Sequence, residues 1–411
     1  MLPPSERELI LLCARQELPD VLARRVQELL GERLDWEMLT TAAWRHGVLP
    51  LLFSNIRRAA SETTIPAEVM HRLRQGYVRA AVRNQAHLQA IALLRERFDK
   101  SGVDMVLLKG AALAQTTYRD PALRPFADID LLVHARDIDS ARIILFDSGY
   151  ALAPELLSES FNRKYHANLP FVRQGERPVH IELHWKLTDS FSGIAFDHEA
   201  LIRRAQRQPG GKVLSTEDTL VYLAAHLDNH GYLNRAMLEQ AARAAFPLDE
   251  LSANRLIWFT DLHELIAARE VDWPLVKQHA DESGAAGALG VTLRWLQKLL
   301  GTAIDTNVLH DLPPAAPRWP ERKMGQYVSA LVTQADRRSS RRAAFQRKLL
   351  TTRKGFELRP IRLIDLWEHM FPVRSSGSHV AHVVRAVAHC AAMFAELQFH
   401  RLLRRVKQRT A

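Results

Sequence analysis

The stretch VDMVLLKGAALAQTTYRDPALRPFADIDLLV, residues 103–133, decides the fold of this chain. It begins with an apolar run over 103–108 and ends with a second one over 128–133. Short apolar runs bounded by glycine and proline are typical of buried strands. Between them we expect a short helix over 111–118 and a turn-rich segment. The stretch therefore predicts two strands of a buried sheet, joined by a helix and turns.

Two aspartates, Asp128 and Asp130, lie two residues apart on the second predicted strand. Side chains alternate along a strand, so both carboxylates project from the same face. Adjacent carboxylates repel each other unless a cation lies between them, and Mg²⁺ is an oxygen-preferring ion that also binds phosphates. Two such ions serve phosphoryl and nucleotidyl transfer. Asp-x-Asp alone is a weak motif, because a strand that ends at the solvent gives the same pattern.

Three residues upstream of the aspartates indicate phosphate binding. Gly110 lets backbone N–H groups approach a phosphate, and the helix that follows favours an anion at its N-terminus. Lys109 adds a point charge, and Arg124 adds a planar donor group suited to phosphate oxygens. The structural alternative is that Gly110 only ends a strand, Lys109 lies on the surface and Arg124 pairs with a neighbouring carboxylate. The order of the three residues before an Asp-x-Asp strand favours binding.

The rest of the chain reads as helices around one small sheet. Residues 1–99 and 215–312 show helical spacing, and VHIELHW, residues 179–185, alternates as a half-buried strand does. The pattern predicts an α+β fold. We expect an N-terminal helical region over 1–99, a core over 100–214, a helical region over 215–312, and a Pro-rich linker with a basic helical tail over 313–411.

Composition excludes several classes of protein. The chain has 411 residues, 47% of them hydrophobic and 25% charged, as in globular proteins. Two cysteines, Cys13 and Cys390, form no disulfide framework. The N-terminus lacks the basic-then-apolar order of a signal peptide, and no run reaches the ~18 apolar residues of a transmembrane helix. We therefore expect a cytoplasmic protein without a transmembrane segment.

The formal charge of +10 is concentrated in the tail. From Arg318 onward there are 20 basic and 6 acidic residues, and the segment 337–354 has eight basic residues and no acidic one. Such asymmetry points to an anionic partner: nucleic acid, a membrane surface or an acidic protein. A basic helix face could bind RNA phosphates or lie on an anionic membrane. The alternative is a helical tail with solvated, arginine-rich faces.

Residues 107–150, from LLKGAALAQTTYRD through DIDLLV to DSGY, resemble the bacterial uncharacterised nucleotidyltransferase family of the DNA polymerase β superfamily. The resemblance covers about residues 34–310. It includes further segments that are similar to the family's N-terminal helices, third core strand and C-terminal helices: 35–52, 179–185, 226–230, 259–266 and 271–273.

The resemblance implies a small mixed, polymerase β-like sheet flanked by helical regions. It implies that Asp128, Asp130 and Glu182 are catalytic and hold two Mg²⁺ ions, and that the substrate is an NTP such as ATP. The acceptor hydroxyl, on a protein, an RNA or a small molecule, would attack the α-phosphate and release pyrophosphate. Lys109, Gly110 and Arg124 would bind the nucleotide. The wider superfamily has Gly-Ser before the pair, at a shorter spacing, whereas this chain has Lys-Gly-Ala at 109–111.

The segment HLDNH, residues 226–230, places His226 and His230 on one face of a predicted helix. We expect both to pack at a helix interface; the alternative is a metal pair completed by Asp261 or His184. The resemblance places these four residues near the cleft, where they could bind the acceptor. The alternative function for the whole chain is a catalytically silent nucleotidyltransferase-fold module, whose basic tail docks to nucleic acid or an anionic membrane.

Overall fold

A computed structural model describes residues 2–59, 65–153, 159, 162–163, 166–188, 194–229 and 256–313. The chain forms two compact units. The first comprises Met1–Leu152, Pro170–Leu187 and Ile194–Pro317, and the second comprises Ala153–Leu169, Thr188–Gly193 and Arg318–Ala411. The basic segment 337–354, and with it the anionic partner expected there, lies outside the described residues, as do His230 and Cys390.

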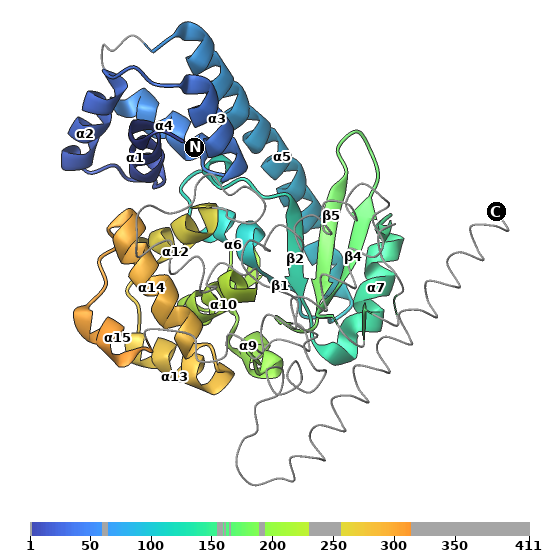
Figure 1. Cartoon of the computed structure of the whole chain (residues 1–411). Coiled ribbons are helices and arrows are strands. Elements are labelled where there is room, and N and C mark those ends of the chain that lie inside the picture. The colour runs from blue at the N-terminus through green and yellow to red at the C-terminus, as the bar shows by residue number, and fades with distance from the viewer. Residues whose placement is uncertain are drawn as a thin grey trace, which may run out of the picture. The chain divides into compact units, whose positions relative to one another are not determined.

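Helices make up most of the first unit (Figure 1). Those before the sheet are α1 (Pro4–Cys13), α2 (Asp20–Leu30), α3 (Trp36–Arg45), α4 (Leu49–Ala59) and α5 (Ala67–Lys100). Those between strands are α6 (Lys109–Thr116), η1 (Pro121–Leu123), η2 (Ala135–Asp137), α7 (Ile138–Asp147) and α9 (His198–Arg204). Those after the sheet are α10 (Thr216–Asn229), α12 (Leu256–Ala268), α13 (Trp273–Ser283), α14 (Ala286–Leu300) and α15 (Thr306–Asp311).

In the described part of the chain, seven strands form one mixed sheet in the order β3-β4-β5-β2-β1-β7-β6. They are β1 (Val106–Leu107), β2 (Asp128–Leu132), β3 (Ala151–Leu152), β4 (Asn168–Arg173), β5 (Val179–His184), β6 (Gln206–Gln208) and β7 (Gly211–Val213). In this sheet β2 is parallel to β5 and antiparallel to β1, and β1 is parallel to β7. The fold is therefore α+β with a mixed sheet, which confirms the predicted fold class.

The long helix α5 joins the N-terminal helices to the sheet (Figure 1). It contacts α3 and α4 as well as β2, β5 and α7. The helix runs from Ala67 to Lys100 and is preceded by Pro66, in a position where a missing N–H costs nothing. Asp35 caps α3, because its side chain accepts a hydrogen bond from the Met38 backbone N–H at 2.9 Å.

The structure corrects the two predicted elements around Lys109. The strand expected over 103–108 has only Val106 and Leu107 in the ladder, because Val103 still bonds back to the end of α5, its N–H donating to the Phe98 carbonyl at 3.1 Å. The helix expected over 111–118 begins at Lys109 and ends at Thr116. The turn into this helix is therefore tighter than the sequence suggests, and Lys109 lies directly at the strand end.

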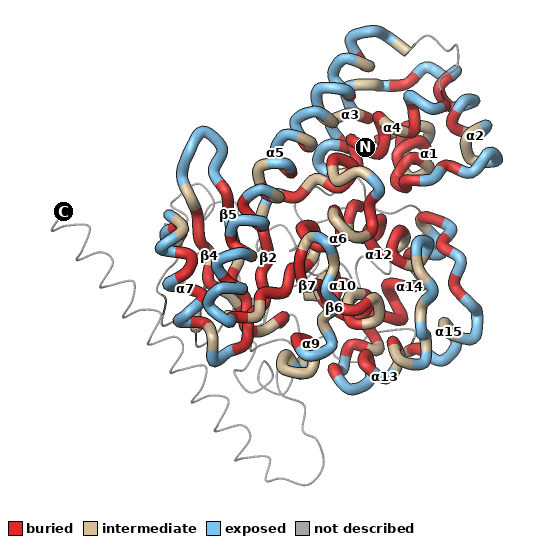
Figure 2. Tube along the Cα trace, turned by 180° about the vertical axis from the view of Figure 1, so that it is seen from behind, coloured by how far each residue is buried: buried red, intermediate tan, exposed pale blue. Residues whose placement is uncertain are grey.

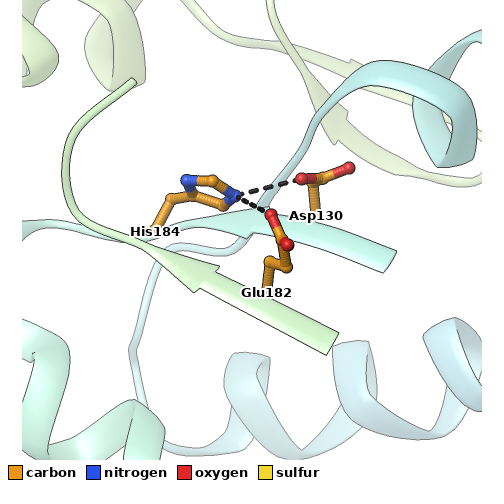
Figure 3. A group of neighbouring side chains, drawn as sticks. All are labelled: Asp130, Glu182 and His184. Carbon is orange, nitrogen blue, oxygen red and sulfur yellow. Dashed lines mark hydrogen bonds and ion pairs between the residues drawn. The ribbon is translucent and has the colours of Figure 1, made fainter. Parts of the chain in front are cut away.

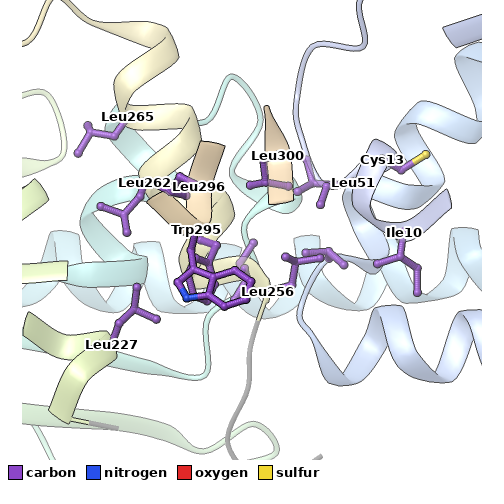
Figure 4. Packing of buried hydrophobic residues seen from close by; sticks show 14 of the residues in the cluster. Ile10, Cys13, Leu51, Leu227, Leu256, Leu262, Leu265, Trp295, Leu296 and Leu300 are labelled. Carbon is purple, nitrogen blue, oxygen red and sulfur yellow. The ribbon is translucent and has the colours of Figure 1, made fainter. Parts of the chain in front are cut away.

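The N-terminal and C-terminal helices share one hydrophobic core (Figure 4). Ile10, Cys13 and Leu51 from the first helices belong to the same cluster as Leu262 and Trp295 from the last ones. Figure 2 shows the strands β2, β4 and β5 largely buried as well. Within the described part of the chain, no helix combines the length and the apolar character needed to cross a membrane.

Candidate functional site

The parallel pair β2 and β5 places the acidic residues side by side. In its register Asp130 lies opposite Glu182, Asp128 opposite His180, and Leu132 opposite His184. Residues opposite each other on neighbouring strands project from the same face of the sheet. The hydrophobic alternates of both strands face the other way, and Ile129 and Leu131 are fully buried. One face therefore collects the polar side chains of both strands.

Three of these side chains form a tight cluster (Figure 3). The Nε2 atom of His184 lies 3.0 Å from Oδ1 of Asp130 and 3.3 Å from Oε2 of Glu182. One ligand atom from each residue falls within 4.8 Å of the other two. Asp130 and His184 are buried, with 2% and 4% of their surface exposed, and Glu182 is half-buried. Two carboxylate oxygens and an imidazole nitrogen in this arrangement could hold a metal ion.

A fourth group, the ammonium of Lys109, binds the same carboxylates. Its Nζ donates to Oδ1 of Asp130 at 2.7 Å and lies 3.9 Å from Oε2 of Glu182. The backbone reinforces this contact, because the N–H of Leu108 donates to the Asp130 carbonyl at 3.0 Å. Lys109 has a φ of 46°, and it is the one non-glycine residue with a positive φ in the described part of the chain. Such a conformation costs energy and tends to occur at functional sites.

The contacts within the cluster shift the pKa of Asp130, Lys109 and His184. Burial would raise the pKa of Asp130, but Lys109 and His184 hold it well below its usual value. Burial would lower the pKa of Lys109, but the charges of Asp130 and Glu182 raise it well above its usual value. For His184, hydrogen bonds to Asp130 and Glu182 outweigh burial and raise the pKa. The Asp130 carboxylate is thus stabilised as an anion by two nitrogen groups.

Asp128 stands two residues before Asp130 on the same face of β2 and is half-buried. It does not belong to the three-residue cluster, whose third member is His184. From the sequence, His184 is a candidate for the acceptor side and, in the alternative, one of two residues that could complete a metal pair with His226 and His230. The alternation in VHIELHW already places it on the face of Glu182, but its proximity to Asp130 depends on the register between β2 and β5.

Arg124 forms an ion pair with a carboxylate inside the protein. Pairing with a carboxylate is the alternative to phosphate binding that the sequence leaves open for this residue. Its Nε and Nη2 donate to both oxygens of Asp261 at 2.6–3.1 Å, and its Nη1 donates to the Pro125 carbonyl at 2.8 Å. The hydroxyl of Tyr118 also donates to Asp261, at 2.9 Å. Asp261 is fully buried. Arg124, Asp261 and Tyr118 therefore form one buried hydrogen-bond network, which the sequence did not predict.

Gly110 lies under the Arg124 side chain. A Cβ atom at this position would lie 2.7 Å from Cβ of Phe126 and 2.8 Å from Nη1 of Arg124. Both distances are shorter than a normal contact between such atoms. The close approach of the α6 backbone to the segment before β2 therefore requires glycine at position 110.

His226 lies among aromatic rings, its ring centroid 4.7 Å from that of Trp258 and 6.2 Å from that of Tyr222. The sequence favours such packing for both histidines of HLDNH, and of the two only His226 is among the described residues. Tyr222 is buried, and together with Lys109 it lines a cavity of about 20 Å³ between β1, α6 and α10.

Comparison with known proteins gives one family and one structural neighbour. A family model described as "Uncharacterised nucleotidyltransferase" matches residues 32–301. Among solved structures, an antigenic nucleotidyltransferase-like protein from Paracoccidioides brasiliensis is similar at 17% sequence identity and a TM-score of 0.33; the match covers 55% of this chain and 96% of that one. No curated protein matches.

Proposed function

Because the chain belongs to the uncharacterised nucleotidyltransferase family, we propose that it transfers a nucleoside monophosphate from an NTP to an acceptor hydroxyl in a Mg²⁺-dependent reaction. The observation that supports this most directly is the convergence of Asp130 and Glu182 from two neighbouring parallel strands, with His184 beside them. Asp128 would add a third carboxylate on the same face, as the two-ion mechanism of the family resemblance requires.

The residues of the cluster fit a divalent ion. The buried carboxylate of Asp130 is held as an anion, and its oxygen lies close enough to that of Glu182 to share one cation. Asp130, Glu182 and His184 would hold the first ion, and Asp128 with Asp130 the second. When bound, such ions would polarise the phosphoryl group and lower the pKa of the acceptor hydroxyl.

The chain's own groups then bind and orient the substrates. The N-terminus of α6 carries backbone N–H groups without intrahelical partners, which favours a phosphate there. Lys109, at the first position of this helix, would neutralise the charge of the triphosphate. Glu182, which is half-buried and closer to solvent than Asp130, would accept the proton of the attacking hydroxyl. The new bond forms between the acceptor oxygen and the α-phosphorus, and the bond to the β-phosphate oxygen breaks, releasing pyrophosphate.

An assay with α-³²P-labelled nucleotides tests this function. Each of the four NTPs is incubated with Mg²⁺, the purified chain and a host lysate, and labelled products are separated and identified. We expect one or more acceptors, the chain itself included, to carry label. The double variant Asp128→Asn, Asp130→Asn should abolish labelling, because both carboxylates lose their charge without losing their shape.

The matched control is Asp281→Asn, which neutralises an exposed aspartate on α13 that pairs with Lys277. Labelling should persist there. Label transfer that survives in the double variant would contradict the proposed site. Nucleotide binding without any transfer by the wild type would favour the silent binding module.

A further inference from the structure

The cluster has two nitrogen groups on one carboxylate oxygen. Lys109 Nζ and His184 Nε2 lie 2.7 Å and 3.0 Å from the same atom, Oδ1 of Asp130, and both also face Oε2 of Glu182. We infer that the Lys109 ammonium is a built-in counter-ion: it occupies the cation position in the ion-free protein, and a divalent ion binds there by displacing it. The inference rests on the proposed function, since it concerns the same carboxylates.

Electrostatics makes the two states mutually exclusive. An ion bound through Oδ1 of Asp130 would share that oxygen with the ammonium, and two cations on one oxygen repel each other strongly where water is excluded. The side chain of Asp130 has only 3% of its surface exposed, so solvent does little to weaken that repulsion. His184 differs from Lys109 in this respect, because a neutral imidazole nitrogen can itself be a ligand of the ion.

Lys109 also borders a small cavity. The cavity has a volume of about 20 Å³, which is room for about one water molecule. The ammonium also acts on the Tyr222 hydroxyl. Burial raises the pKa of Tyr222, and the positive charge of Lys109 counteracts that rise. The positive φ of Lys109 costs backbone energy. The contact of its ammonium with Asp130 offsets this cost, and a change of the turn to a negative φ would remove it.

Displacement would couple the ion to the nucleotide. In the ion-free protein the ammonium is held by Asp130 and Glu182, so it is unavailable to a phosphate. Once an ion has replaced it, the ammonium lies free at the first residue of α6, where the triphosphate is expected. Ion and nucleotide would then bind with positive coupling, through one lysine that changes partners.

The first experiment measures ion affinity without any substrate. Mn²⁺ is titrated into the metal-free protein, and free Mn²⁺ is followed by electron paramagnetic resonance. We expect Lys109→Met to bind Mn²⁺ about 10- to 100-fold more tightly than the wild type, because the ion no longer has to break a charged hydrogen bond. Lys212→Met is the matched control: Lys212 is paired with Asp104, and its side chain is 20% exposed against 18% for Lys109. Its Mn²⁺ affinity should equal that of the wild type.

The second experiment needs no variant, so it holds even if Lys109→Met fails to fold. Wild-type protein is reductively methylated with formaldehyde and cyanoborohydride, with and without saturating Mg²⁺, and labelled peptides are quantified by mass spectrometry. The modification rate of Lys109 should rise several-fold with Mg²⁺, while that of Lys212 stays constant.

The outcomes separate this inference from the proposed function. If the wild type transfers label from an NTP but Lys109→Met binds Mn²⁺ no more tightly, or Lys109 reactivity ignores Mg²⁺, the displacement is wrong and the proposed function stands. If the wild type binds no Mn²⁺ and transfers no label, both are wrong.

Discussion

At the scale of single residues, the turn between β1 and α6 concentrates the unusual features of the molecule. Lys109 adopts a positive φ, and Gly110 allows α6 to touch the segment before β2. Lys109 places its ammonium against the carboxylate of Asp130. Gly110 allows the close packing that holds Lys109 at this position. Both residues thus hold the start of α6 against β2, the strand that carries Asp128 and Asp130.

Gly110→Ala should be strongly destabilising. The added Cβ would lie 2.7 Å from the Cβ of Phe126, which is fixed to the backbone and cannot swing away. Overpacking of a well-packed site costs about 1–3 kcal/mol, and urea denaturation followed by circular dichroism would measure it. Gly175→Ala is the control, since a Cβ at residue 175 meets nothing within 4 Å. Equal stabilities of the two variants would contradict the tight approach.

At the scale of secondary-structure elements, the segment between α6 and β2 is held from both sides. On α5, the side-chain amide of Asn84 donates to the carbonyls of Pro121 and Arg124 at 2.6 Å and 2.8 Å. On α12, Asp261 receives hydrogen bonds from Arg124 and Tyr118. The segment that delivers the chain into β2 is therefore fixed by buried polar contacts to two helices far apart in the sequence.

Removing Asp261 should loosen this connection. Asp261→Ala leaves the Arg124 guanidinium buried without its counter-charge, which costs about 3–5 kcal/mol of unfolding free energy. Tyr118→Phe removes one hydrogen bond to the same carboxylate and should cost only about 1–3 kcal/mol. Chemical denaturation measures both. A loss for Asp261→Ala no larger than that for Tyr118→Phe would show that the ion pair contributes little.

At the scale of the whole first unit, burial has left several histidines in their neutral form. Burial lowers the pKa of His87 on α5, His198 on α9 and His263 on α12 to about 4. The ordinary value is 6.5, so between these limits the unfolded chain binds protons that the folded chain does not. The stability these residues contribute is complete above pH 6.5 and is lost as the pH falls toward 4.

Acid should therefore destabilise the fold over a defined window. The urea midpoint should fall between pH 6.5 and pH 4.5, and His87→Phe should make this fall shallower. His87 suits the test, because its Nδ1 has no hydrogen-bond partner and its ring packs 5.1 Å from that of Phe126. A pH dependence that is identical in wild type and variant would contradict the buried neutral state of His87.

The sequence predicted the elements with local signals better than those without. The runs 128–133 and 179–185 became β2 and β5 within one residue. The outer strands β3, β4, β6 and β7 were not predicted, since runs of two to six residues with mixed polarity carry little periodicity.

What the sequence determined by itself is the family, the α+β class and the shared face of Asp128 and Asp130, because strand alternation and local patterning depend only on neighbours along the chain. Only the tertiary structure decided that His184 joins Asp130 and Glu182, that Lys109 binds the same oxygens, and that Arg124 pairs with Asp261. The contacts of Lys109 and His184 with Asp130 and of Arg124 with Asp261 span 21 to 137 residues. They follow from the register of two parallel strands and from helix packing, which short-range pattern does not encode.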